Sequence, residues 1–288
     1  MQNNYLLKKP KKHKSSVIFN CPHSGRDYKV LSNISKINNF DIRSSEDFFV
    51  DEFFNNVDEF GSYFLNANFP RAYVDLNRSH LEIDPKLFLS LPENSYSLTK
   101  KVQSGLGVIP RVVGEGKEIY DTVLNYEVAK SRLKNFYFPY HAKLKKIIEL
   151  NLKKFGEVFI FDCHSMPHSS LSNIFCNEED KPDIVLGNCY GTSCKKEIFD
   201  LVSQIFENNG FKVYLNIPFC GGFITKHYGQ PKESINSIQI EINRKLYMNE
   251  ENQQKLKGFE KIKYKFQIIS EQLSKISMLD HNLQQAAE

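Results

Sequence analysis

Short runs of apolar residues alternate along the chain with longer segments in which apolar residues recur at helical spacing. The short runs predict strands at Val17–Cys21, Tyr63–Leu65, Val108–Val112, Val158–Cys163, Asp183–Leu186, Lys212–Asn216 and Ser237–Ile242. The helical spacing predicts helices at Glu46–Phe60, with Ser45 as N-cap, and at Asp121–Asn135, His141–Lys154, Cys194–Asn209 and Asn249–Met278. This order of elements is typical of an α/β fold with a mixed, mostly parallel sheet flanked by helices.

No internal repeat and no long linker interrupts this pattern. We therefore expect a single α/β domain over residues 16–278. A basic tail is expected before it, at residues 1–15, and a frayed tail after it, at residues 279–288.

The composition argues against an obligate nucleic-acid binder and against a membrane-spanning protein. Of the 288 residues, 41% are hydrophobic and 25% are charged, which is ordinary for a soluble globular protein. The net charge of +4 is too small to indicate an obligate nucleic-acid binder. The lysine-rich tract Lys8–Lys14 has no interleaved aromatic residues, so it favours a solvated tail over an RNA-binding segment. No apolar run approaches the roughly 18 residues of a membrane span.

Six cysteines are dispersed through the chain, which is long enough to bury a core without disulfides. No apolar segment of the signal-peptide type follows the N-terminal lysines. We therefore predict a cytoplasmic protein with six reduced thiols, and we expect the sulfurs of Cys21 and Cys163 to point into the core by strand alternation.

Two histidines follow predicted strands directly, within Cys21–Gly25 and Asp162–Ser165. In open α/β sheets ligands bind beyond the carboxyl ends of the strands, and a catalytic zinc takes three protein ligands and one water. His23 and His164 are thus candidate ligands, and Glu46 or Asp47 could supply a carboxylate. A single histidine in this position is more often a hydrogen-bonded loop residue, and acids at a helix start often only oppose the helix dipole.

Two further clusters could carry chemistry. Strand alternation places Gln239, Glu241 and Asn243 on one face, so Glu241 is either solvated or a general base in a cleft. In the segment Arg71–Arg78 the arginines could bind carboxylates or an oxyanion, although isolated arginines more often form surface salt bridges.

Together these segments resemble the N-formylglutamate amidohydrolase family, whose fold and zinc site are similar to those of zinc carboxypeptidases (phosphorylase/hydrolase-like). The resemblance rests on Asn20–Gly25, Glu46–Glu52, Arg71–Arg78, Asp162–Pro167, Gly221–Gly229, Gln239–Arg244 and Leu246–Met248. It implies one Zn²⁺ ion per chain and hydrolysis of N-formyl-L-glutamate to L-glutamate and formate, a step of histidine catabolism. The implied partner is a small N-acyl amino acid, with neither nucleic acid nor membrane.

The resemblance also implies roles for individual residues. His23, Asp47 and His164 would bind zinc, with Glu46 as the alternative to Asp47, and Glu241 would be the general base. Arg71 or Arg78 would stabilise the oxyanion, and substrate would contact Arg71, Asn77, Arg78, Arg111 and His227.

The chain departs from these patterns at two positions. Arg26 stands where zinc carboxypeptidases have a glutamate ligand, and Lys226 stands where the family has arginine. Other functions therefore stay open: a related deacylase or carboxypeptidase acting on another N-acyl amino acid or a peptide, or a metal-free carboxylate-binding protein.

Overall fold

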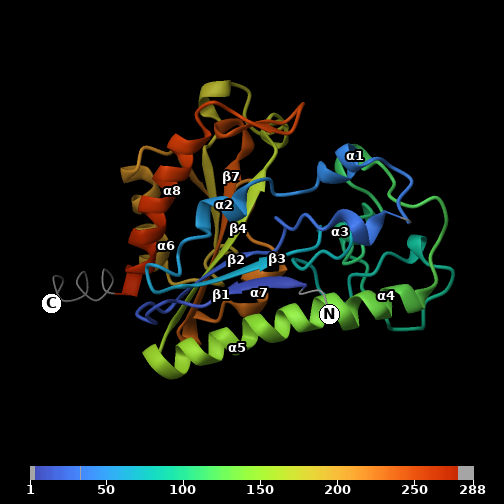
Figure 1. Cartoon of the computed structure of the whole chain (residues 1–288), viewed down its shortest axis with the longest axis horizontal. Coiled ribbons are helices and arrows are strands. Elements are labelled where there is room, and N and C mark those ends of the chain that lie inside the picture. The colour runs from blue at the N-terminus through green and yellow to red at the C-terminus, as the bar shows by residue number, and fades with distance from the viewer. Residues whose placement is uncertain (1–3, 33, 278–288) are drawn as a thin grey trace. The chain divides into compact units, whose positions relative to one another are not determined.

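A computed structural model describes residues 4–32 and 34–277 (Figure 1). The backbone forms two compact units. Unit 1 comprises Met1–Leu6, Pro22–Glu46 and Asn66–Lys146, and unit 2 comprises Leu7–Cys21, Asp47–Leu65 and Ile147–Glu288. The prediction of one domain over residues 16–278 stays a prediction, and the tail at 279–288 lies outside the described residues.

A seven-stranded sheet has the order β1-β3-β2-β4-β7-β5-β6. Strands β2 and β7 both run parallel to β4, β6 runs parallel to β5, and β5 is antiparallel to β7. The predicted mixed, mostly parallel α/β sheet is thereby confirmed. The strand bounds are β1 Tyr5–Lys8, β2 Val17–Cys21, β3 Tyr63–Ala67, β4 Val158–Met166, β5 Ile184–Gly187, β6 Val213–Leu215 and β7 Ile235–Asn243.

One face of the sheet in unit 2 is apolar because every second residue is hydrophobic. The register aligns Phe19, Phe161 and Ile238 across β2, β4 and β7, and all three are buried in one core. Helices α2 (Val50–Phe54), α6 (Lys196–Asn208) and α8 (Phe259–Ser274) contribute buried side chains to that core, and α6 and α8 lie side by side in Figure 1. Each such aromatic or aliphatic side chain contributes about 1.5–3 kcal/mol by burial.

The opposite face carries the polar residues of the same strands. The register places Asn20, Asp162 and Gln239 in one row, and His164 beside Glu241 in the next row with the same orientation. Helix α7 (Phe223–Tyr228) contacts β4 and β7, and its N-terminal residue Gly222 donates a backbone hydrogen bond to Gln239. The polar face is therefore the side on which ligand chemistry can take place.

The remaining elements are short, apart from α5 (Phe138–Phe155). In unit 1 they are α1 (Asn39–Arg43), α3 (Lys100–Gln103), α4 (Tyr126–Arg132), a π-helical turn (Leu133–Tyr137) and the 3₁₀ helices Tyr28–Leu31, Pro85–Leu87 and Gly114–Gly116. In unit 2 they are the two-stranded pair β8 (Met248–Asn249) and β9 (Gln254–Lys255) and the 3₁₀ helices His168–Leu171, Glu178–Asp180, Pro231–Glu233 and Arg244–Leu246.

The predicted strand Val108–Val112 is wrong. Pro110 has no amide to donate, and the backbone of Val108 bonds to two loop residues, Asp75 and Glu82, rather than to a neighbouring strand. Val108 and Ile109 are buried all the same, so their hydrophobicity reflects the packing of a loop in unit 1. At Gly107 a side chain would meet the carbonyl oxygen of Glu82 at 2.5 Å, which explains the glycine.

Three predicted helices begin later than expected. Helix α2 starts at Val50, after Phe49 in the left-handed region (φ 61°), so Ser45 is not its N-cap and Glu46 and Asp47 precede it. Helix α8 starts at Phe259 because the β8–β9 pair occupies the segment before it. The predicted end of this helix, Met278, lies outside the described residues. The predicted helix Asp121–Asn135 begins only at Tyr126 and continues through the π-helical turn into α5.

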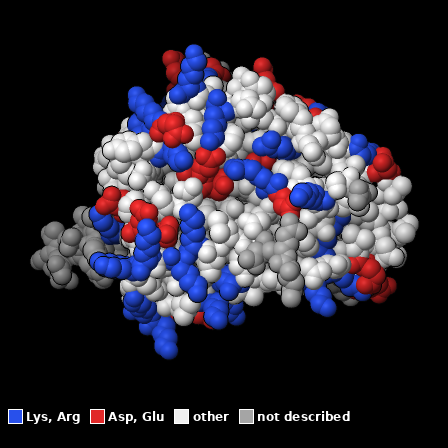
Figure 2. Space-filling model, viewed as in Figure 1, with Lys and Arg blue, Asp and Glu red and all other residues white. Residues whose placement is uncertain are grey.

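The N-terminal segment contains a strand that the sequence analysis does not predict. Within the residues 1–15 assigned to a basic tail, Tyr5–Lys8 form β1, and Lys11 pairs with Glu59 at 3.1 Å. Figure 2 shows lysines and arginines interspersed with acids over much of the visible face, in line with the net charge of +4. Among the described helices, none combines the length and apolar character needed to cross a bilayer.

Candidate active site

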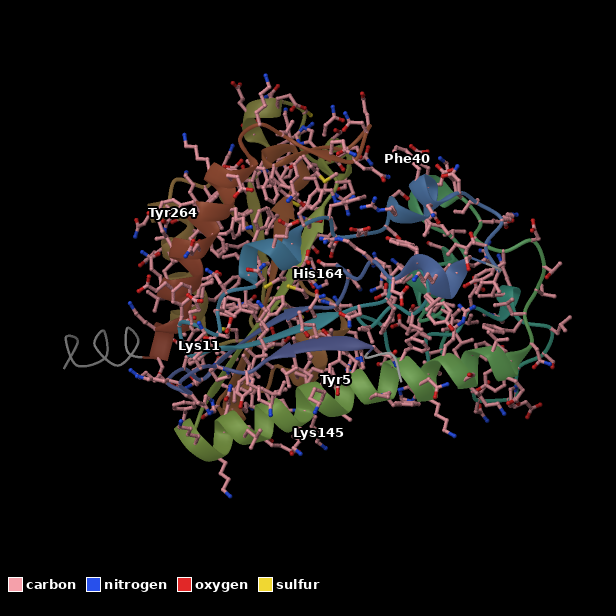
Figure 3. All side chains as sticks on the ribbon, in the orientation of Figure 1. Tyr5, Lys11, Phe40, Lys145, His164 and Tyr264 are labelled. Atoms are coloured by element: carbon pink, nitrogen blue, oxygen red, sulfur yellow. The ribbon has the colours of Figure 1, made fainter. Side chains whose placement is uncertain are left out.

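His164, labelled in Figure 3, belongs to β4. Its ring lies between two carboxylates. Its Nδ1 is 2.9 Å from Asp47 Oδ2, and its Nε2 is 3.0 Å from Asp162 Oδ2. Burial alone would lower the pKa of His164, but the charges and hydrogen bonds of Asp162 and Asp47 hold it well above its usual value. The imidazole is thus fixed in orientation from both ring nitrogens.

Asp162 is itself held in place by the neighbouring strand. Asn20 of β2 donates from Nδ2 to Asp162 Oδ1 at 2.7 Å, and both side chains are fully buried. This contact follows from the strand register, which pairs the two residues directly. The sequence analysis assigned no role to either residue, although both lie in segments that carry the family resemblance.

Asp47 is held on its second oxygen. Ser165 Oγ donates to Asp47 Oδ1 at 3.3 Å, and Arg244 Nη2 lies 3.5 Å from the same oxygen. Arg244 Nε also donates to Ser165 Oγ at 3.0 Å. Arg244 was quoted in the segment Gln239–Arg244 but received no role. The signal that could have found it is its position immediately after the strand that carries Glu241.

Glu241 lies on the polar face of β7, as strand alternation predicts. It is the register partner of His164, so the two side chains project from adjacent strands to the same side of the sheet. Gln239 Nε2 donates to Glu241 Oε1 at 2.7 Å, and Gly222 N donates to Gln239 Oε1 at 2.7 Å. The Glu241 side chain is only 8% exposed, so it is not a solvated residue at the edge of the sheet. The amide of Gln239 sets its orientation.

In unit 1, His23 is held by a buried aspartate. His23 Nε2 lies 2.7 Å from Asp75 Oδ1, and Arg71 Nη2 lies 2.9 Å from Asp75 Oδ2. Arg78 Nη2 is 3.9 Å from Asp75 Oδ2, and the Asn77 backbone donates to Asp75 Oδ1 at 2.9 Å. Burial alone would raise the pKa of Asp75, but Arg71, Arg78 and His23 together hold it well below its usual value.

Asp75 should therefore contribute to acid stability. A carboxylate whose folded-state pKa is lowered stabilises the fold fully above its unfolded pKa of about 3.9, and this contribution is lost as the pH falls through the folded value. With a chelator present, we expect Asp75→Asn to lower the free energy of unfolding at neutral pH and to flatten its fall below about pH 4. Urea unfolding across pH measures both, and an unchanged acid slope in the variant would contradict the assignment.

Glu46 is surrounded by cations of its own unit. Its carboxylate lies 3.1 Å from Arg26 Nε and 2.9 Å from Arg43 Nε, and Tyr28 Oη donates to it at 2.8 Å. Burial, together with Glu46, raises the pKa of the Tyr28 hydroxyl, so that group stays a donor. Arg26 thus binds the carboxylate that the sequence left as the alternative ligand. The contacts within the units favour Asp47 over Glu46.

Two candidate substrate contacts have other partners or are exposed. Arg111 Nε lies 2.9 Å from Asp84 Oδ2 and its Nη1 lies 3.3 Å from Glu118 Oε1, so this guanidinium is engaged by two acids. His227 is exposed on α7, where its ring stacks on Phe223 at 4.8 Å between centroids. Lys226 is exposed on the same helix.

The cysteines lie where strand alternation puts them. Cys21 follows Asn20 of the polar face, and Cys163 precedes His164 of the same face. Both cysteines are buried in the apolar core, as predicted. All six cysteines of the chain are free thiols in the structure.

Comparison with known proteins identifies the family. The sequence model of the N-formylglutamate amidohydrolase family matches residues 15–248. The chain belongs to this family. All the candidate site residues, from His23 to Arg244, lie within the matched range.

Members and solved structures of the N-formylglutamate amidohydrolase family agree with this assignment. The chain is 27% identical over 207 residues to the N-formylglutamate deformylase of Pseudomonas putida, covering 71% of each chain. It is 24% identical over 244 residues to the N-formylglutamate deformylase of Pseudomonas aeruginosa, covering 84% of this chain and 85% of that one. The crystal structure of N-formylglutamate amidohydrolase from Ralstonia eutropha superimposes with a TM-score of 0.87 at 29% identity, covering 94% of this chain and 97% of that one.

Proposed function

We propose that the chain hydrolyses N-formyl-L-glutamate to L-glutamate and formate in the cytoplasm. The observation that supports this proposal is the register pairing of His164 with Glu241 across β4 and β7, because it would set a candidate metal ligand beside a candidate general base. The names of the two Pseudomonas relatives, which are N-formylglutamate deformylases, support the choice of substrate.

We propose further that His23, Asp47 and His164 hold one zinc ion. All three are buried, and as a group they have the donor atoms that could hold a metal ion. The Asp47 Oδ2 to His164 Nδ1 separation of 2.9 Å fits this use, because ligands of tetrahedral zinc at about 2.0–2.1 Å lie about 3.3 Å apart. In His23 and in His164 the Nε2 atom faces an aspartate, which leaves Nδ1 as the ligand atom.

When bound, zinc would lower the pKa of a water molecule and polarise the formyl carbonyl. Glu241 would accept a proton from the attacking water on its carboxylate and then deliver it to the departing nitrogen of glutamate. Gln239 would keep the carboxylate oriented during both steps. Arg71 or Arg78 would stabilise the oxyanion, because each already presents its guanidinium to the buried Asp75 beside His23.

The substrate carboxylates need cations or amide donors that protein acids do not already engage closely. Arg78 lies 3.9 Å from Asp75, whereas Arg111 lies within 3.3 Å of two acids, so Arg78 is the better suited cation and the Asn77 amide could donate beside it. His227 and Lys226 are exposed on α7, so they would contact a substrate that binds beside this helix. Lysine in place of the family's arginine keeps the charge but removes the bidentate fork, which bears on substrate preference.

A panel of N-acyl amino acids and short peptides tests the proposal, with release of free amine measured with and without zinc. We expect zinc-dependent hydrolysis with the highest kcat/KM for N-formyl-L-glutamate. A preference for another N-acyl amino acid or a peptide would make the chain a related deacylase or carboxypeptidase. Binding of glutamate by a protein that takes up no zinc and shows no turnover would favour the metal-free carboxylate-binding protein.

Asp162→Asn is a test of the carboxylate that orients His164. Removing such an outer-shell partner typically weakens metal binding about 10- to 100-fold, because the imidazole loses its fixed tautomer. We expect zinc affinity, measured by competition with a chromophoric chelator, to fall within that range. Unchanged affinity would mean that Asp162 serves only the packing between β2 and β4.

A further inference from the structure

Arg244 is a buried cation at the end of the strand that carries Glu241. It opens the 3₁₀ helix Arg244–Leu246 directly after β7, and it is 5% exposed. Its Nε donates to Ser165 Oγ at 3.0 Å, and its Nη2 lies 3.5 Å from Asp47 Oδ1. The guanidinium thus contacts Asp47 Oδ1 directly. It also contacts this oxygen indirectly, because Ser165 Oγ, which accepts from Arg244, donates to Asp47 Oδ1 at 3.3 Å.

The two oxygens of Asp47 therefore have different surroundings. Oδ2 lies against His164 Nδ1 at 2.9 Å, whereas Oδ1 is held by Ser165 and Arg244. A carboxylate held at one oxygen cannot rotate about its terminal bond without breaking those contacts. The other oxygen is consequently fixed in the direction of the histidine.

The guanidinium is anchored on its other side as well. Arg244 Nη1 lies 3.8 Å from Glu250 Oε2, and the Phe48 ring centroid lies 5.7 Å from its central carbon. Glu250 in turn accepts a hydrogen bond from the His168 backbone at 2.8 Å. Arg244 therefore joins Asp47 to the segment that follows β4.

A hydrophobic side chain would fill this space at lower cost if packing were its only purpose. Replacing a buried ionic group by apolar residues is often neutral or stabilising, because burying charge carries a large desolvation penalty. The polar face of the sheet, however, gathers the carboxylates Asp47, Asp162 and Glu241, and a fixed cation beside Asp47 offsets part of their mutual repulsion.

We propose that Arg244 is a positioning residue, which fixes Asp47 Oδ2 toward His164 and thereby sets the affinity for the metal ion. This inference rests on the proposed use of Asp47 and His164 as metal ligands. Arg244 would thus influence the affinity for zinc without contacting either the substrate or the metal ion. Lysine can restore the charge but not the fork that engages Ser165 and Asp47 together.

The test compares zinc affinities, measured by competition with a chelator, for wild type, Arg244→Met, Arg244→Lys and Val202→Ala. We expect Arg244→Met to bind zinc about 10- to 100-fold more weakly and Arg244→Lys to fall between it and wild type. Val202 is fully buried on α6, in the core on the apolar face of the sheet, so its variant loses stability without touching the polar face. Its zinc affinity should equal that of wild type.

Three results would overturn the inference, and they are distinguishable. Wild-type affinity in Arg244→Met would show that Asp47 needs no anchor. Equal weakening in Val202→Ala would show that affinity only follows stability. A wild-type chain that binds no zinc would remove the proposed metal site and this inference with it. If Arg244→Met does not fold, Ser165→Ala removes the bridging hydroxyl instead, and it should weaken zinc binding by a smaller factor.

Discussion

Glu241→Gln is expected to lower kcat for N-formyl-L-glutamate by about 10²- to 10⁴-fold, the usual contribution of a general acid–base group. Glutamine has the same shape, but it cannot accept the proton of the attacking water at neutral pH. The neighbouring amide of Gln239 can rotate to pair with either side chain, so the packing on β7 should survive. Zinc content and KM should therefore change little.

Steady-state kinetics and metal analysis of the same preparation check this expectation. Asn243→Asp is a useful companion variant, because it adds a carboxylate to the same strand face two residues further along. It should not rescue Glu241→Gln, because the side chain at position 243 lies against the carbonyl oxygen of Pro182, to which the asparagine donates and an aspartate could not. If Glu241→Gln retained more than about a tenth of wild-type kcat, the proton would have to travel through another group, and Asp51 and His227 would be the next candidates.

The parts of the site that lie on strands could be predicted from sequence because strand alternation is a local rule. The period of two places Asp162 and His164 on one face of β4 and Gln239 and Glu241 on the matching face of β7. The apolar register partners Phe161 and Ile238 likewise predict the core face. The sheet was therefore predicted correctly, and the shared face expected for Gln239, Glu241 and Asn243 agrees with the register, whereas the roles of these residues stay predictions.

The parts that depend on loops could not be predicted in the same way. Arg111 was expected to meet substrate, but the charges that engage it, Asp84 and Glu118, come from separate loops of unit 1. The hydrophobic run Val108–Val112 looked like a strand because buried loops are as apolar as buried strands. Hydrophobicity reports burial, whereas hydrogen-bond partners, which decide the secondary structure, are set by tertiary contacts.

The preference for Asp47 over Glu46 rested on the family resemblance, because both residues were expected at the start of one helix, Glu46–Phe60. In the structure both residues precede α2 and neither is helical. Their orientations are set instead by long-range partners: Arg26 and Arg43 for Glu46, and His164 for Asp47. The sequence feature that could have favoured Asp47 was the arginine at position 26. A buried carboxylate paired with this arginine has its charge neutralised, so it is a poorer metal ligand than an unneutralised one.

Asp47→Asn is accordingly expected to abolish stoichiometric zinc binding, while Glu46→Gln is expected to retain it. Asparagine keeps the shape of Asp47 but replaces a charged oxygen donor by a neutral amide, so the loss should exceed the 10- to 100-fold typical of an outer-shell substitution. Glu46→Gln instead leaves Arg26 and Arg43 without their carboxylate, so its main effect should be on stability. Equilibrium dialysis against zinc, with thermal unfolding of both variants, separates the two losses. The opposite result, with zinc retained in Asp47→Asn and lost in Glu46→Gln, would transfer the ligand role to Glu46. It would also remove the reason for an arginine anchor at position 244, since Arg244 contacts Asp47.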